Sequence, residues 1–239
     1  MAPTASGSAL PIYLQISETL IRDIAAGRLS DGSRLAPERD LARRFGVAVG
    51  TLRKALADLE ERGLLDRRQG SGNYVRAAPT PQGIYAFFRL EKLDGGGLPG
   101  ARVLSVDRLR KPATLPSFGV SIDAHRIRRL RTLDGTAAAL EEIWLDASFA
   151  ERLAPEALSD SLYLVYRDAL GLIVTGYEDR IGLGPCPAWA PADFGPRAGS
   201  PCGLVERRSH GRGFGVAEVS QTWFDGNVAR YVARMKEDT

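Results

Sequence analysis

Residues 35–75 constrain the fold of this chain more than any other stretch. Two short amphipathic segments meet there at a tight turn, Phe45-Gly46-Val47, and a basic segment with the glycine-rich tip Gln69-Gly70-Ser71-Gly72 follows. Leu52, Leu56 and Leu59 recur at helical spacing, which predicts a buried face on the second segment. The pattern predicts a helix-turn-helix followed by a wing, and this arrangement grips duplex DNA.

The elements around this motif can be placed from periodicity and from stop signals. Apolar residues recur every four positions from Ile12 to Ile24, which predicts a helix that starts near Pro11 and ends before Gly27. A second helix is expected from about Pro37 to Gly46, with Leu41 and Phe45 facing inward. A third is expected from about Ala48 to Arg62, and strands are expected at residues 64–67 and 73–76.

Polar side chains on the third helix and the wing form the predicted DNA contact. Arg53 has the reach for guanine or phosphate, and Thr51 the reach for phosphate or a thymine methyl group. A solvated helical hairpin beside an ordinary surface turn is the alternative, but the basic wing at the right distance favours DNA binding. The predicted contact residues are Arg34, Arg39, Thr51, Arg53, Lys54, Arg67, Arg68, Gln69, Gly70 and Ser71.

Charge is distributed in a way that agrees with this contact. The net charge is +3, and the whole excess falls in residues 1–78, because the remainder carries equal numbers of acidic and basic residues. A DNA contact needs its positive charge there.

Several other kinds of site and location are not expected. The two cysteines and two histidines lack the spacing of zinc ligands, so no metal site is predicted, and no cofactor is expected either. His125 and His210 are expected at the surface, and Cys186 is expected in a loop. The first 15 residues lack the basic and apolar regions of a signal peptide, and no apolar run is long enough to span a bilayer. A cytoplasmic protein without a membrane partner is expected.

The rest of the chain has a different character. Residues 77–83 are rich in proline and poor in apolar residues, which predicts a linker. One helix is expected at Ser159–Leu170. Many strands with few helices indicate an α+β domain on a mainly antiparallel sheet over residues 84–239. Strand-like runs occupy Ile84–Leu90, Arg102–Leu109, Arg126–Thr132, Ala138–Leu145, Ile173–Leu183, Cys202–Ser209 and Glu218–Phe224.

Residues 10–76 resemble the winged helix-turn-helix domain of the GntR family of bacterial transcription regulators. The resemblance rests on Glu38-Arg-Asp-Leu-Ala, Phe45-Gly-Val, Thr51-Leu-Arg-Lys-Ala-Leu and Arg67-Arg-Gln-Gly-Ser-Gly. Two departures stand out. Ala36-Pro37 replaces the family's Pro-Ser, and Ala48-Val49-Gly50 replaces Ser-Arg-Thr. The second change removes an arginine that usually contacts a base, so the family's usual operator sequence is not carried over.

The second domain resembles the UTRA effector domain of the HutC-type subfamily, which has a chorismate-lyase-like fold. The matching segments are Arg129-Leu-Arg-x-Leu-Asp-Gly, Glu141-Glu-x-Trp-Leu, Ser161-Leu-Tyr and Glu218-Val-Ser-x-Thr-Trp-Phe. The resemblance implies effector contacts from Arg129, Arg131 and Glu141. Tyr163 is a further candidate, and Tyr231 is one because Ala229 stands where the family often has a tyrosine.

Physical reasoning leaves the role of the two arginines open. Arg129 and Arg131 are two apart on a predicted strand and so share one face, where they could hold a phosphate or a carboxylate. Cross-strand salt bridges on a wet face are a close competitor.

Two classes of function follow from these observations. The leading hypothesis is a homodimeric regulator that is not an enzyme: a repressor released from a palindromic double-stranded operator by a small anionic effector. The alternative is a lyase-like enzyme that uses the chorismate-lyase-like domain. No catalytic constellation is visible in the sequence.

Overall fold

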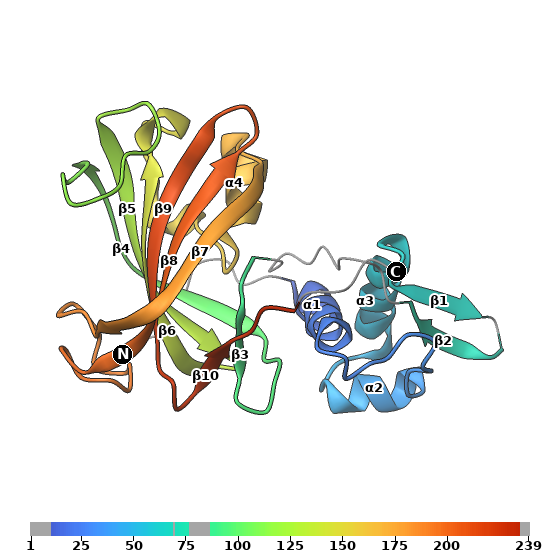
Figure 1. Ribbon diagram of the computed structural model, residues 1–239. Helices are drawn as coiled ribbons and strands as arrows, with labels where there is room; N and C mark the ends of the chain where they lie inside the picture. Colours follow the sequence, from blue (N-terminus) through green and yellow to red (C-terminus); the bar gives the residue numbers. More distant parts are fainter. Residues whose placement is uncertain (1–10, 69, 77–86, 235–239) are drawn as a thin grey trace, which may run out of the picture. The chain divides into compact units, whose positions relative to one another are not determined.

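The computed structural model describes residues 11–68, 70–76 and 87–234 (Figure 1). The chain divides into two compact units. One is Pro99–Arg230, and the other holds the described residues up to Leu98 together with those from Tyr231 onward. The linker expected at residues 77–83 lies outside the described residues. Contacts group residues 87–98 with the N-terminal unit, although the sequence placed them in the second domain.

Three helices form the core of the first unit: α1 (Ile12–Ala25), α2 (Glu38–Arg44) and α3 (Val49–Glu61). Leu52, Leu56 and Leu59 of α3 are fully buried, as the spacing predicts. The stripe on α1 is confirmed except at its first member, because Ile12 is 57% exposed while Ile21 is buried instead. Apolar burial of these side chains is what fixes the angle between the helices.

The wing is an antiparallel hairpin of β1 (Leu65–Arg68) and β2 (Gly72–Val75). Gly70 turns the chain with φ of 75°, a left-handed conformation that a side chain disfavours. Val75 and Leu65 lie opposite each other and are buried in the helical core. The wing is therefore rooted in the hydrophobic core while its tip stays exposed.

A short strand, β3 (Leu90–Lys92), pairs with β10 (Ala229–Tyr231). Near it, the buried Arg22 of α1 donates hydrogen bonds to the carbonyl oxygens of Phe88 and Leu90, at 3.2 and 2.5 Å. Arg22 thereby attaches the segment before β4 to the first helix.

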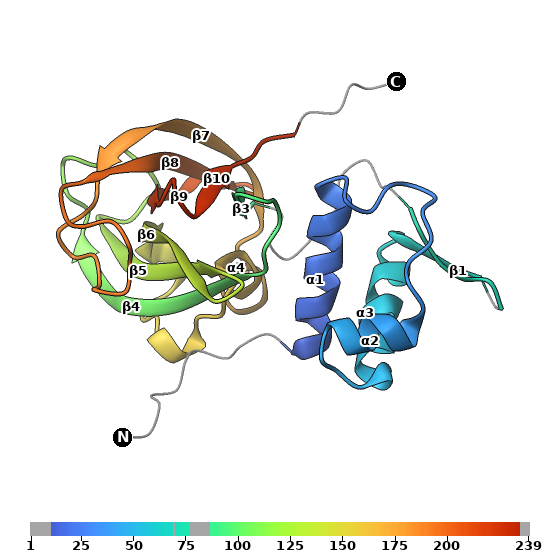
Figure 2. The ribbon, with the colours of Figure 1, turned by 90° about the horizontal axis from the view of Figure 1, so that it is seen from below.

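A six-stranded antiparallel sheet dominates the second unit, in the order β4-β5-β6-β9-β8-β7. Figure 2 shows that this sheet is curved rather than flat. Four of the five pairings join strands that follow each other in the sequence, and the fifth joins β6 to β9. The strands are β4 (Pro99–Arg110), β5 (Asp123–Leu133), β6 (Thr136–Asp146), β7 (Val174–Pro185), β8 (Pro201–Gly211) and β9 (Gly215–Phe224).

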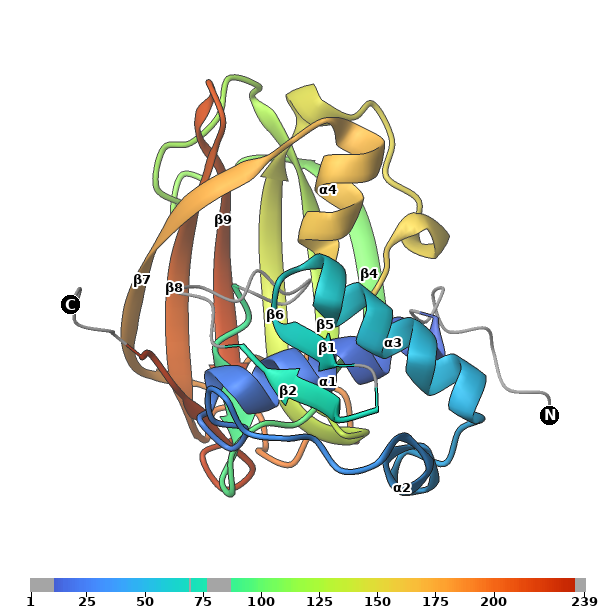
Figure 3. The same ribbon diagram turned by 90° about the vertical axis from the view of Figure 1, so that its right-hand side faces the viewer.

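One face of the sheet, here called the α4 face, packs against α4 (Leu162–Leu170) (Figure 3). Tyr166 of α4 is fully buried in a cluster with Ile127 and Ile143. Two short 3-10 helices, Ala147–Phe149 and Pro155–Ala157, lead from β6 to α4. The opposite face carries a separate apolar cluster around Leu130, Leu140 and Trp223.

Six of the seven strand predictions for this unit are confirmed, and four expectations differ from the structure: one strand, the start of the helix, and the burial of two residues. The run predicted at Ile84–Leu90 lies partly outside the described residues, and the strand that is seen begins only at Leu90. The helix begins at Leu162, three residues later than expected. His125 was expected at the surface but is buried, with its Nε2 2.8 Å from the carbonyl oxygen of Ala150. Cys186 was expected in a loop but is buried in the core cluster with Cys202.

Among the described residues, no helix is both long and apolar enough to cross a membrane. In the same part of the chain, no group of His, Cys, Asp and Glu side chains could hold a metal ion.

Candidate DNA-binding surface and effector site

The polar side of α3 is open to solvent, as a DNA contact requires. Arg53 and Lys54 are exposed and Thr51 is half-buried, while Ala48 and Gly50 leave the start of the helix uncovered by side chains. Small residues at a helix N-terminus allow a phosphate backbone to approach closely. The predicted α3 residues are therefore available to DNA.

Glu38 of α2 contacts both α3 and the wing, a role that the sequence did not reveal. Its carboxylate accepts a hydrogen bond from Arg53 Nε at 2.7 Å and lies 3.5 Å from Arg67 Nη2. The hydrogen bond from Arg53 holds the pKa of the Glu38 carboxyl below its usual range. One carboxylate thus orients two predicted DNA-contacting arginines, one on each element.

Side chains of the wing also hold each other. Arg68 stacks over the Tyr74 ring, with its guanidinium carbon 4.6 Å from the ring centroid, and the Tyr74 hydroxyl lies 2.8 Å from Ser71 Oγ. Arg34 is exposed and forms a backbone bridge with Tyr74. Arg39 and Gly70 are exposed, whereas the predicted contact Gln69 lies outside the described residues. The wing therefore has a basic surface whose side chains are held in place by contacts with one another.

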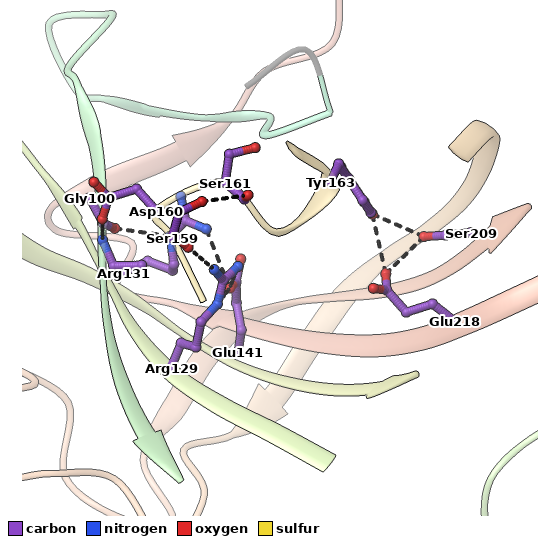
Figure 4. Close-up of polar contacts among 11 residues, drawn as sticks. Gly100, Arg129, Arg131, Glu141, Ser159, Asp160, Ser161, Tyr163, Ser209 and Glu218 are labelled. Atoms are coloured by element: carbon purple, nitrogen blue, oxygen red, sulfur yellow. Dashed lines mark hydrogen bonds and ion pairs between the residues drawn. The ribbon is translucent and has the colours of Figure 1, made fainter. Parts of the chain in front are cut away.

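The three effector residues implied by the family resemblance meet on the α4 face (Figure 4). Arg129 on β5 and Glu141 on β6 are directly opposite in the register, and Arg129 Nη2 donates to Glu141 Oε2 at 2.6 Å. Arg131 lies 3.5 Å from the same oxygen and donates through Nε to the Gly100 carbonyl oxygen at 3.0 Å. Cross-strand ion pairing, the competing interpretation, is thus present, but it is buried rather than wet.

Two guanidinium groups and one carboxylate lie together in this cluster, out of contact with solvent. Arg129 and Arg131 are each 3% exposed. Burial alone would raise the pKa of Glu141, but the two guanidinium groups hold it below its usual value. Guanidinium groups on one face of a sheet have the chemistry to bind a phosphate or a carboxylate.

A second polar group on the α4 face was not assigned from the sequence. Glu218 on β9 accepts hydrogen bonds from Ser209 Oγ at 3.0 Å and from the Tyr163 hydroxyl at 3.2 Å (Figure 4). Burial raises the pKa of Glu218, and burial together with the charge of Glu218 raises that of Tyr163. Tyr163, a predicted effector residue, is thereby joined to a buried acid.

Strand register explains why these residues share one face. Directly opposed side chains point to the same side of a sheet, and the register pairs Leu145 with Glu218 and Glu218 with Ser209. Alternation places Glu218 and Thr222 on the same face of β9, and Thr222 lies opposite Glu141. This alternation could have identified Glu218 as a residue on the face of Glu141. Tyr231 lies on β10 and groups with the N-terminal unit, so its contact with an effector stays a prediction.

Each of the two units matches a known protein family. Residues 12–75 match the family of bacterial regulatory proteins named gntR, and residues 95–230 match the UTRA domain. The chain is 59% identical over 231 residues to the HTH-type transcriptional regulator SmoD of Agrobacterium fabrum, covering 97% of this chain and 99% of SmoD. It is 30% identical over 161 residues to the HTH-type transcriptional repressor NagR of Bacillus subtilis, covering 65% and 66% of the two chains.

The fold is also seen in solved structures. The crystal structure of YydK from Bacillus subtilis, described as a possible transcriptional regulator, aligns with a TM-score of 0.53 at 20% identity. The alignment covers 95% of this chain and all of YydK. The two chains therefore share a fold over nearly their whole length. The chain belongs to the GntR family of bacterial transcription regulators, in the HutC subfamily whose members carry a UTRA domain, and it is a DNA-binding regulator rather than an enzyme.

Proposed function

We propose that this regulator is a cytoplasmic repressor, and that a small anionic metabolite bound beside Arg129 and Arg131 releases it from a palindromic operator. The observation that carries the proposal is the buried cluster with two arginines and one carboxylate. Arg129 and Arg131 lie on one face of the sheet, and guanidinium groups bind phosphate and carboxylate groups with paired hydrogen bonds. Repression is supported by the similarity to NagR, which is a transcriptional repressor.

The palindrome and the dimer follow from the size of the DNA contact. One α3 helix with its wing covers a half-site, and two copies related by a two-fold axis read a symmetric operator. Each half-site would be gripped by Arg34, Arg39, Thr51, Arg53 and Lys54, with the wing residues Arg67–Ser71 beside them.

Fluorescence anisotropy on the duplex upstream of the gene for this chain tests the proposal. The protein is titrated across a salt series, alone and with inorganic phosphate, glucose 6-phosphate, gluconate or methylphosphonate, and with neutral glucose as the control. We expect saturable, salt-sensitive and sequence-selective binding that one of the anions releases and glucose does not. Selective binding that none of the anions weakens would contradict the anionic effector, and the absence of selective binding would contradict the operator.

A pair of variants on one strand separates the effector site from general damage. Arg131→Met removes a guanidinium from the α4 face, and we expect it to abolish release by the anion while operator affinity is kept. Arg128→Met is the matched control, because Arg128 lies on the same strand but pairs with Glu142 on the opposite face, at 2.7 Å. Equal loss of release in both variants would contradict the assigned site.

A further inference from the structure

The edge of the six-stranded sheet at β7 is unusually open. The sheet order gives β7 a neighbour, β8, on one side, and on its other side no strand within the described residues. Long, flat edge strands invite pairing with another chain, and proteins protect them with lysine, proline or bulges. From Val174 to Gly184 the strand has neither lysine nor proline, and its register irregularity falls at one end, at Val174 and Gly176.

Exposed apolar side chains lie on this same edge. Ile181 is 56% exposed and Leu183 is 81% exposed, and they share a face because they are two residues apart. That face is the α4 face, because the register places Ile181 in line with Val205, Thr222 and Glu141. The alternation also places Glu178 and Arg180 together on the opposite face, where they form a 2.9 Å ion pair. The edge therefore offers one apolar row and one charged row to a partner.

We propose that β7 pairs antiparallel with β7 of a second copy of this chain, about a two-fold axis at Asp179. In this register Glu178 of one protomer lies opposite Arg180 of its partner, and the reverse pair forms on the other side of the axis. Tyr177 lies opposite Ile181, and Gly176 opposite Gly182. The strand is thus complementary to itself in charge and in side-chain size, which a two-fold interface requires.

The central residue of this register is already neutralised within each chain. Asp179 would face its own copy, and two carboxylates opposite each other repel. However, Arg207 of the same chain binds Asp179 with two hydrogen bonds, Nε to Oδ1 at 2.6 Å and Nη2 to Oδ2 at 2.7 Å. The axis would therefore bring together two neutral ion pairs rather than two bare acids.

This inference rests on the proposed dimeric regulator and identifies the surface through which the two copies associate. Two charge substitutions, each made in a separate variant, test the β7 interface. In Glu178→Arg both facing positions are basic, and in Arg180→Glu both are acidic, so each variant repels a copy of itself. When the two variants are mixed, every facing pair becomes opposite in charge again. Weakening of both variants alone, together with recovery in the mixture, is what this register predicts.

The experiment is sedimentation velocity of full-length protein over a concentration series, with thermal unfolding to confirm that each variant is folded. We expect the wild-type chain to dimerise, each variant alone to dimerise at least about tenfold more weakly, and their equimolar mixture to recover the dimer. Arg152→Glu, which changes an exposed arginine in the loop after β6, is the charge control and should dimerise as the wild type does.

Two results would overturn the β7 interface: either variant alone dimerising as tightly as the wild type, or a mixture that recovers no dimer. Anisotropy on the operator and on a single half-site is measured in parallel. Selective DNA binding by a chain whose dimer survives both substitutions would reject this edge and leave the regulator intact. A wild-type dimer that fails to select the operator would instead reject the proposed repressor function.

Discussion

Single residues decide how this regulator would read DNA, and Glu38 is the clearest case. Its carboxylate holds Arg53 of α3 and Arg67 of the wing, although a negative charge near phosphates opposes binding. We expect Glu38→Gln to leave or strengthen binding to a scrambled duplex while it lowers selectivity for the operator, because both arginines lose their orientation. Anisotropy on both duplexes measures this. An unchanged ratio of the affinities for the operator and the scrambled duplex would show that Glu38 does not contribute to sequence selectivity.

Arg53 itself should read a base. We expect Arg53→Ala to weaken binding to the specific operator by about 1–3 kcal/mol, with a smaller effect on a scrambled duplex. Arg43→Ala removes the same charge from the same unit and serves as the control, because Arg43 is an exposed residue of α2 whose side chain is 80% exposed. Equal losses in the two variants would assign Arg53 to non-specific attraction.

The buried acid Glu218 predicts a pH dependence of stability. Its folded pKa is raised above the ordinary 4.5, so folding favours the protonated form and this contribution to stability is lost as the pH rises through the folded pKa. We expect Glu218→Gln, which still accepts hydrogen bonds, to unfold at a higher temperature than the wild type at neutral pH. The difference should vanish below pH 4.5. A variant that is less stable at neutral pH would show that the carboxylate is stabilising.

At the scale of elements, Asp146 shows how one side chain at a strand end organises a loop. It is fully buried and accepts hydrogen bonds from Lys111 Nζ at 2.6 Å and from the Ser121 backbone at 3.0 Å, which fixes the chain between β4 and β5. We expect Asp146→Asn to destabilise the protein by about 1.5–3 kcal/mol, because hydrogen bonds to a charged group are lost. Chemical denaturation measures this loss, and an unchanged stability would show that the loop is held by other contacts.

Elements with strong periodicity could be predicted from the sequence. Leu52, Leu56 and Leu59 identified α3. Six of the seven strand-like runs correspond to the long strands β4 to β9, and Arg129 and Arg131 share one face of the sheet. Contacts across the chain could not be predicted in this way. Glu38 meets Arg67 only because the wing folds back beside α2, and His125 is buried because a loop carbonyl supplies its hydrogen bond. Three-residue strands such as β3 carry too few residues to show a period.

At the scale of the whole molecule, one stretch of chain links the two functions. Arg131 of the effector cluster binds the carbonyl of Gly100 at the start of β4, and Arg22 of α1 binds the carbonyls of Phe88 and Leu90 shortly before it. We expect Arg22→Met to keep operator binding but to weaken its release by the anion, whereas Arg44→Met, an exposed arginine of α2, should behave as the wild type. Unimpaired release in Arg22→Met would show that the coupling takes another route.

The central claim is that anion binding and operator binding oppose each other in one molecule. Coupling of this kind is reciprocal, so each ligand must weaken the other by the same factor. The most direct measurement is calorimetric titration of the releasing anion into the free protein and into its operator complex. We expect the anion to bind the complex more weakly than the free protein, by the same factor by which the anion weakens operator binding. Equal affinity of the anion for the free and the DNA-bound protein would contradict it.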